Sequence, residues 1–597
     1  MTPTALVENQ RASTSIPRHR RVLSDVLGSW TPKVPSMLLW FIMSLLLVIP
    51  VLAFLGQAII PGLFGTPKGL TGLASFKHAL TGTTLRGVLD SLIVSIFSAL
   101  LAAACGIFLA LLTKRTNVIA KKWWSMMTWV LLLVPTYLIT EGWQRLFEPH
   151  GVLYNIGINT SSFYHVFFGP VGVIVVLSTA GTPFAYLAIS SGLLGLGSEF
   201  EDAARVHGSG ALATLRAVLP IIAPAIMSAL AIVFAESMSD FGVASTLAAQ
   251  ANFPVATYSL FNAIDSFPLN FGVAAAIGWI LVVAAGIPIL VQSKALRGRS
   301  YEVLSGRTRT PRLSVLSNKG QLFAVASLAL FFTIALGVPA IGVISASLLS
   351  NFGSNFSVHS LTLANYREVL HSRQLFAPLS LSTALSFLTA TLTVALGIAV
   401  ARAMTNPRAK AAAKLIDLIM LGSVALPGIV LAAGYIFFYN LPAMSSFGIN
   451  IYGTTKLLAL GYLAGALPST ARLLVGPVSQ VQSNLKDAAR VHGASGRVSW
   501  LKTQLPLLAR PVLWAWLLTF AKTLLELPLS QLLYAPNFPP ISVSINKLTA
   551  GYDFGGGTAM SVISLALALG VFLVAAGLFR LLAPSGWQKV GEGLTAK

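Results

Sequence analysis

The chain has 597 residues, of which 55% are hydrophobic and only 10% are charged, whereas soluble domains carry about 25% charged residues. This composition excludes an ordinary soluble protein and predicts an integral membrane protein in a lipid bilayer. The net charge of +22 does not indicate a nucleic-acid-binding protein, because Lys and Arg gather in short segments beside apolar runs, as the positive-inside rule describes.

In chain order, a basic arm over 1–36 is followed by apolar runs long enough to cross a hydrocarbon core of about 30 Å. The spans expected in the first half, 37–293, are about 37–60, 88–112, 123–142, 167–190, 221–240 and 270–292. An arginine-rich linker, 294–320, leads to the second half, 321–597, with spans at about 322–348, 379–401, 416–438, 456–475, 511–529 and 558–582. We therefore expect an all-α integral membrane protein with about 12 transmembrane helices in two parallel six-helix repeats.

Basic loops predict the orientation of these spans. The loop after the second span contains Arg115, and the loop after the eighth contains Arg402. Both loops should lie in the cytoplasm. Counting spans then places both termini and the linker in the cytoplasm as well.

A seven-residue repeat is the strongest sign of internal duplication. Asp-Ala-Ala-Arg-Val-His-Gly occurs at 202–208 and again at 487–493, each time between a long apolar run and a Leu-Pro pair. The pattern predicts a short helical turn that ends at the glycine. A single copy would be typical of a capped loop, whereas two copies at matching positions favour a shared function. Pro135 and Pro183 also recur as Pro427 and Pro468, and each is expected to bend a spanning helix.

The repeated motif resembles the Glu-Ala-Ala…Gly…Leu-Pro loop of ABC-importer permeases of the binding-protein-dependent type. The chain looks like two such permeases fused, which implies the type I importer transmembrane fold. In that family the loop is a coupling helix that docks on a dimeric ABC ATPase. The resemblance therefore implies docking residues Asp202, Ala203, Ala204, Arg205 and Gly208 in the first loop, and Asp487, Ala488, Ala489, Arg490 and Gly493 in the second. Aspartate stands where the family has glutamate.

The chain contains no Gly-x-x-x-x-Gly-Lys-Ser/Thr segment. We therefore expect a transport subunit with no ATPase site, cofactor or metal of its own, and ATP bound by a separate subunit. The resemblance also implies an extracytoplasmic solute-binding protein as a partner and a bacterial inner membrane as the location.

The substrate stays open at this point. Segments 239–242, 426–430 and 525–528 are similar to the fused permeases for ferric iron, and closely similar permeases are associated with thiamine and aminoethylphosphonate. Ferric iron is the first choice among these. An ion-coupled secondary transporter can also have two parallel six-helix halves, but it would not need matched docking loops. A membrane enzyme is disfavoured because no nucleophile–base arrangement is visible.

Four charged residues near the ends of the fifth and eleventh spans are candidates for the translocation pathway. Glu236 and Asp240 are four residues apart, as are their counterparts Lys522 and Glu526, so each pair shares one helix face. They could be solvated helix ends, or they could line the outer mouth of the pathway. In the second case Glu236 and Lys522 would pair across it, and Asp240 and Glu526 would face a cationic substrate.

Overall fold

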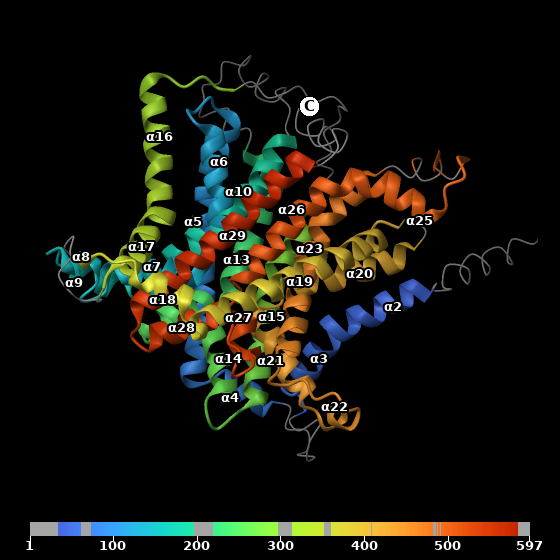
Figure 1. The fold of residues 1–597 in the computed structure, drawn as a ribbon, viewed down its shortest axis with the longest axis horizontal. Coiled ribbons are helices and arrows are strands. Elements are labelled where there is room, and N and C mark those ends of the chain that lie inside the picture. The colour runs from blue at the N-terminus through green and yellow to red at the C-terminus, as the bar shows by residue number, and fades with distance from the viewer. Residues whose placement is uncertain are drawn as a thin grey trace, which may run out of the picture.

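The computed structural model describes residues 34–60, 73–195, 219–296, 313–350, 360–406, 409–481, 485, 488, 489 and 491–582. Within these residues the regular structure is helical, apart from three isolated bridges (Figure 1). The predicted all-α class is confirmed.

The first half begins with one long helix that contains a single π-helical turn, in the order α2 (Val34–Met43), η1 (Ser44–Val48) and α3 (Ile49–Gly56). The rest of the half comprises α4 (Ala74–Ala79), α5 (Gly82–Arg115), α6 (Lys121–Leu133), α7 (Thr136–Phe147), α8 (Val152–Asn155), α9 (Ser161–Phe167), α10 (Pro170–Gly195), α13 (Ala223–Ser239), η2 (Ala244–Ala248), α14 (Ala256–Asp265) and α15 (Phe271–Leu296).

The second half repeats this order. It comprises α16 (Asn318–Phe332), η3 (Thr333–Gly337), α17 (Val338–Leu348), α18 (Ala364–His371), α19 (Arg373–Met404), α20 (Lys410–Val424), α21 (Gly428–Tyr439), α22 (Pro442–Ser446), α23 (Thr455–Gln480), α25 (Gly496–Ser499), η5 (Trp500–Gln504), α26 (Leu505–Leu524), α27 (Pro528–Leu533), α28 (Ile541–Ala550) and α29 (Phe554–Leu582). Even the π-helical turn recurs, since η1 and η3 each lie two residues before a proline, Pro50 and Pro339.

The candidate membrane spans follow the predicted segments except at the third, fifth and ninth. Nine helices of the described part are long and apolar enough to cross a membrane, and two bent helix pairs raise the number to eleven. The apolar helix α13 is shorter, so twelve crossings stay a prediction. The third and ninth spans are broken at Pro135 and Pro427, where α6 meets α7 at 96° and α20 meets α21 at 103°. The predicted bends at Pro183 and Pro468 do not break α10 or α23.

The backbone before and at the proline explains the first bend, and Pro427 at the second bend has a similar ψ of 135°. Val134 and Pro135 are both extended, with ψ values of 117° and 154°. Proline disfavours helical dihedrals in the preceding residue and cannot donate a helical hydrogen bond. The third span of each half is therefore broken into two helices of different direction.

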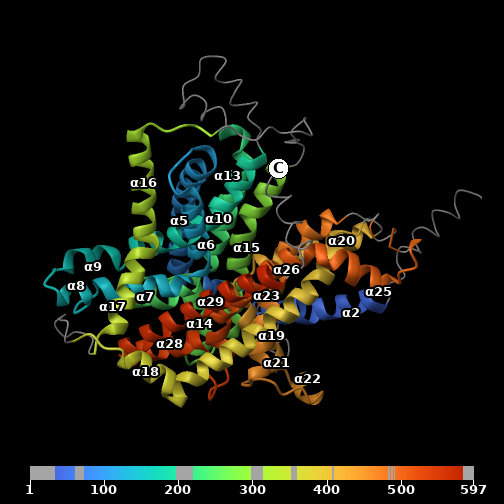
Figure 2. The same ribbon diagram turned by 45° about the horizontal axis from the view of Figure 1, so that its top comes forward.

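The first long helix of each half packs against the other half. α17 lies on α7, and α3 lies on α21. A Cβ atom placed on Gly142 of α7 would lie only 2.2 Å from the Pro339 oxygen, and one on Gly434 of α21 would lie 3.0 Å from the Pro50 oxygen. Small residues allow such close approach in membrane helices. The amino-terminal segments of these long helices, α2 and α16, consequently stand at opposite ends of the molecule (Figure 2).

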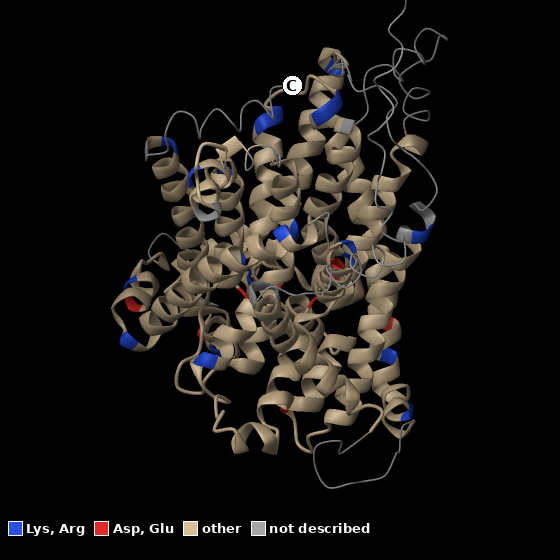
Figure 3. Cartoon of the chain, turned by 90° about the vertical axis from the view of Figure 1, so that its right-hand side faces the viewer, with Lys and Arg blue, Asp and Glu red and all other residues tan. Residues whose placement is uncertain are grey.

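Two contacts bring predicted cytoplasmic segments together. The end of the linker pairs with the loop after α5, because Ser314 N donates to Arg115 O at 2.8 Å and Asn117 N donates to Ser314 O at 3.2 Å. At the other half, the Arg402 guanidinium carbon lies 4.1 Å from the centroid of the Trp500 ring, close after the second repeat motif. Charged residues are sparse along the long helices (Figure 3). The two contacts agree with the predicted cytoplasmic location of these segments. The orientation of the spans stays a prediction.

Candidate functional site

The repeat motif is described only in part. Asp202, Ala203, Ala204, Arg205 and Gly208 of the first copy lie outside the described residues, as do Asp487 and Arg490 of the second. In the second copy His492 N donates to Ala488 O at 3.2 Å, and Ala494 N donates to Ala489 O at 3.0 Å. Gly493 then has a φ of +80°. This left-handed conformation is the one expected for a glycine that ends a helical turn.

The described part of this loop presents small and apolar groups outward. The Val491 side chain is 86% exposed, and a Cβ atom added at Gly493 would meet nothing within 4 Å. A single exposed apolar side chain is ordinary at a protein surface and does not by itself indicate a contact. Docking of this loop on an ATPase stays a prediction.

The two carboxylates of the predicted pathway occupy breaks in the helices. Asp240 directly follows α13, where Oδ1 accepts from Val243 N at 2.7 Å and Oδ2 accepts from Thr136 Oγ1 at 2.7 Å. Glu526 follows α26, where Oε1 accepts from Leu529 N at 2.9 Å and Oε2 from Ser530 N at 3.0 Å. Each carboxylate thus satisfies backbone N–H groups that the break leaves without helical partners.

The main chain at these breaks is also matched between the halves. The carbonyl oxygen of Asp240 accepts from Thr257 Oγ1 at 2.8 Å, and that of Glu526 accepts from Ser542 Oγ at 2.5 Å. These hydroxyls belong to the equivalent helices α14 and α28. The carboxylates therefore have a structural function that the sequence did not reveal, and their role toward a substrate stays a prediction.

The other two pathway candidates do not pair as predicted. Glu236 and Lys522 are both exposed, and among the ion pairs of the described residues none joins them. Lys522 Nζ instead lies 5.3 Å from the centroid of the Phe184 ring in α10 of the other half. An aromatic face offers a cation a favourable contact within about 6 Å, which explains why the ammonium group can be placed there without a carboxylate.

A buried polar cluster on α7 was missed at the sequence level. Glu141 is only 4% exposed, yet Oε2 accepts from Ser561 Oγ of α29 at 2.8 Å and Oε1 accepts from Thr549 Oγ1 of α28 at 3.5 Å. Both donors belong to the second half of the chain. Glu141 therefore joins the two halves through hydrogen bonds.

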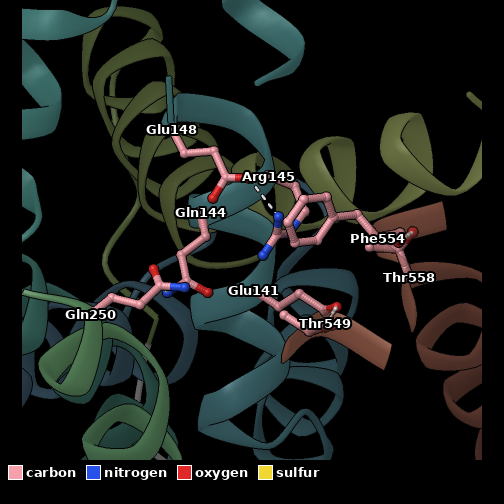
Figure 4. A network of polar contacts seen from close by, with 8 residues as sticks. All are labelled: Glu141, Gln144, Arg145, Glu148, Gln250, Thr549, Phe554 and Thr558. Carbon is pink, nitrogen blue, oxygen red and sulfur yellow. Dashed lines mark hydrogen bonds and ion pairs between the residues drawn. The ribbon is translucent and has the colours of Figure 1, made fainter. Parts of the chain in front are cut away.

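Arg145, one turn further along α7, completes this cluster (Figure 4). Its side chain is fully buried, with Nη1 2.5 Å from Glu148 Oε1 and the guanidinium carbon 3.9 Å from the centroid of the Phe554 ring. Two charges four residues apart within an apolar stretch were a visible signal of a buried site. Their partners in α28 and α29 lie about 400 residues away, which no local pattern reveals.

Comparison with known proteins finds relatives among ABC-transporter permeases. Residues 102–299 match the family described as binding-protein-dependent transport system inner membrane component. A probable ABC transporter permease protein of Sinorhizobium fredii is 25% identical over 64% of this chain and 66% of its own length. The ferric transport system permease protein of Actinobacillus pleuropneumoniae is 22% identical over 74% of this chain and 64% of its own length. A Salmonella typhimurium permease named for 2-aminoethylphosphonate transport is 27% identical over 32% of this chain and 69% of its own length.

The repeated order of apolar helices defines an all-α, multi-pass membrane protein. The family match and the relatives then support the resemblance found in the sequence to ABC-transporter permeases of the binding-protein-dependent type. The matched segment lies in the first half, and this chain spans about two thirds of the length of the relatives.

Proposed function

We propose that this chain supplies both transmembrane subunits of an ABC importer as one fused polypeptide. The observation that carries this proposal is the position of the repeat motif. The first copy lies between α10 and α13, and the second lies between the equivalent helices α23 and α26. Two identical loops in equivalent places suit a dimeric ATPase, with one loop for each subunit.

In the proposed mechanism, closure of the ATPase dimer moves the two loops and the helices that follow them. α13 and α26 lead directly from these loops to the breaks capped by Asp240 and Glu526. Rigid helices transmit displacement along their length, so motion at the loops reaches the breaks. ATP is bound by the separate subunit, and this chain contributes no cofactor.

The proposed cargo is a small solute delivered by an extracytoplasmic binding protein, with ferric iron as the first candidate. The ferric transport permease among the relatives supports iron, as do segments 239–242, 426–430 and 525–528. The relative named for 2-aminoethylphosphonate supports that solute as an alternative, and thiamine is a third. The proposed location is a bacterial inner membrane with both termini in the cytoplasm, which reporter fusions at each end would test.

Uptake by reconstituted vesicles tests this function. The chain would be reconstituted with a candidate ABC ATPase and a candidate solute-binding protein, and vesicles would be offered labelled ferric iron, 2-aminoethylphosphonate or thiamine. We expect uptake of one solute that requires both partners and ATP hydrolysis. Uptake driven by an ion gradient without ATP would overturn the proposal in favour of a secondary transporter.

A further inference from the structure

The two halves touch through a pair of equivalent contacts that differ in chemistry. On one side α7 faces α28 and α29, and on the other α21 faces α14 and α15. The register between α7 and α21 follows from Gly142 and Gly434, which both meet a proline of the opposite first helix. The register between α29 and α15 follows from Phe554 and Phe271, their first residues.

Charged residues occupy only one of these contacts. The shift that relates Gly142 to Gly434 places Glu141 opposite Ala433, Arg145 opposite Phe437 and Glu148 opposite Asn440. The Arg145 guanidinium stacks on the Phe554 ring, whereas Phe437 packs on the Phe271 ring with a centroid distance of 5.9 Å. The α7 contact is therefore ionic and the α21 contact is aromatic.

The partner helices differ in the corresponding way. Ser561 of α29 corresponds to Gly278 of α15, and Thr549 of α28 corresponds to Ile264 of α14. A Cβ atom on Gly278 would lie 3.5 Å from the Val430 side chain, so this part of α15 lies against α21. The hydroxyls that hold Glu141 are thus present only on the second half.

We propose that the cluster on α7 determines which halves pair, so that the first half binds the second half and not another first half. In a pair of two first halves, Glu141 would be buried against Gly278 and Ile264. Neither has a side-chain donor, so Glu141 would lose both hydrogen bonds from the opposite half and keep only Arg145 of its own helix. The loss of hydrogen-bond donors is unfavourable for a buried carboxylate. The apolar contacts repeat in both halves, so selectivity has to come from an element that penalises the wrong partner.

This inference depends on the contacts of the described residues and not on transport, so its test needs neither ATP nor substrate. A protease site is placed within 297–312 of the full chain, and two preparations with different tags on the first half are purified and then cut. Second halves of one preparation carry a fluorescent label. The preparations are mixed and warmed until this label is shared between them, which proves that halves exchange.

For the unchanged protein, we expect that purification through one tag recovers second halves but no first half that carries the other tag. A variant combining Glu141→Ala with Arg145→Phe carries the residues of α21 in α7, and we expect both tags to be recovered together. Joint recovery of both tags with the unchanged protein would overturn the proposal. Equally strict pairing in the double variant would overturn it as well.

Two serines of α29 provide a matched control for packing. Ser561 Oγ bonds to Glu141 across the halves at 2.8 Å, whereas Ser564, also buried, donates to Met560 O of its own helix at 2.6 Å. Ser561→Ala should raise the dissociation of the cut halves by about tenfold, as expected for a hydrogen bond to a charged group. Ser564→Ala should change it less than about twofold, and equal effects of the two variants would contradict the role of Glu141.

Discussion

Replacing Gly142 by alanine should separate the two halves at one defined point. The new Cβ atom would lie 2.2 Å from the Pro339 oxygen and 2.4 Å from its Cα. Carbon and neighbouring heavy atoms prefer about 3.5 Å, so α7 and α17 must move apart by roughly 1 Å. Because the atoms in the way belong to the backbone, no side-chain rotation can relieve the clash.

The size of the effect can be compared with two other glycines. Overpacking of this kind costs about 1–3 kcal/mol. Gly434→Ala, whose Cβ would be 3.0 Å from the Pro50 oxygen, should cost less. Gly286→Ala in α15 would meet nothing within 4 Å, and it should leave stability unchanged or raise it, because alanine favours a helix by about 1 kcal/mol over glycine.

Thermal stability in detergent is the measurement. Each variant is heated, and the fraction that remains monodisperse is followed by size-exclusion chromatography, which suits proteins that unfold irreversibly. The midpoint temperature should fall in the order Gly286→Ala, Gly434→Ala, Gly142→Ala. If Gly142→Ala were as stable as Gly286→Ala, the close packing of α7 on α17 would be refuted.

Three further outcomes are expected. Ala489→Trp should abolish co-purification of the ATPase at unchanged thermal stability of the permease, and retained binding would contradict docking through this loop. Asp240→Asn combined with Glu526→Gln should reduce uptake at equal membrane abundance, whereas normal uptake would leave these groups as helix caps alone. Thr136→Val removes the donor to Asp240 and should destabilise by about 1–3 kcal/mol, while Thr128→Val, which loses only a bond within its own helix, should cost less in the same heating assay.

Much of the helical arrangement could be predicted because it follows from local patterns. Apolar length predicted the segments, and the repeat predicted that both halves share one order of elements. Pro135 and Pro427 marked the two broken spans, although proline alone does not determine a bend near a right angle. Gly493 has the left-handed conformation that a helix-ending glycine suggests.

Contacts between the halves could not be predicted in this way. The packing of α3 and α17 on the opposite half depends on a small residue of one helix lying against a proline of another, as Gly142 lies against Pro339. Hydropathy does not encode that match. Glu141 was visible as a charge in an apolar stretch, but only three-dimensional packing brings Ser561 to it.

The packing of the first long helix of each half against the opposite half has a consequence for biosynthesis. α7 is synthesised well before its cover, α17, which ends at Leu348, and the donor Ser561 lies 420 residues after Glu141. The first half therefore cannot mature as an independent domain during translation, although amino-terminal domains generally do. Until α28 and α29 have been synthesised, a nascent chain must keep a carboxylate and a guanidinium in the membrane without their final surroundings, so this contact between the halves forms only after α29 has emerged.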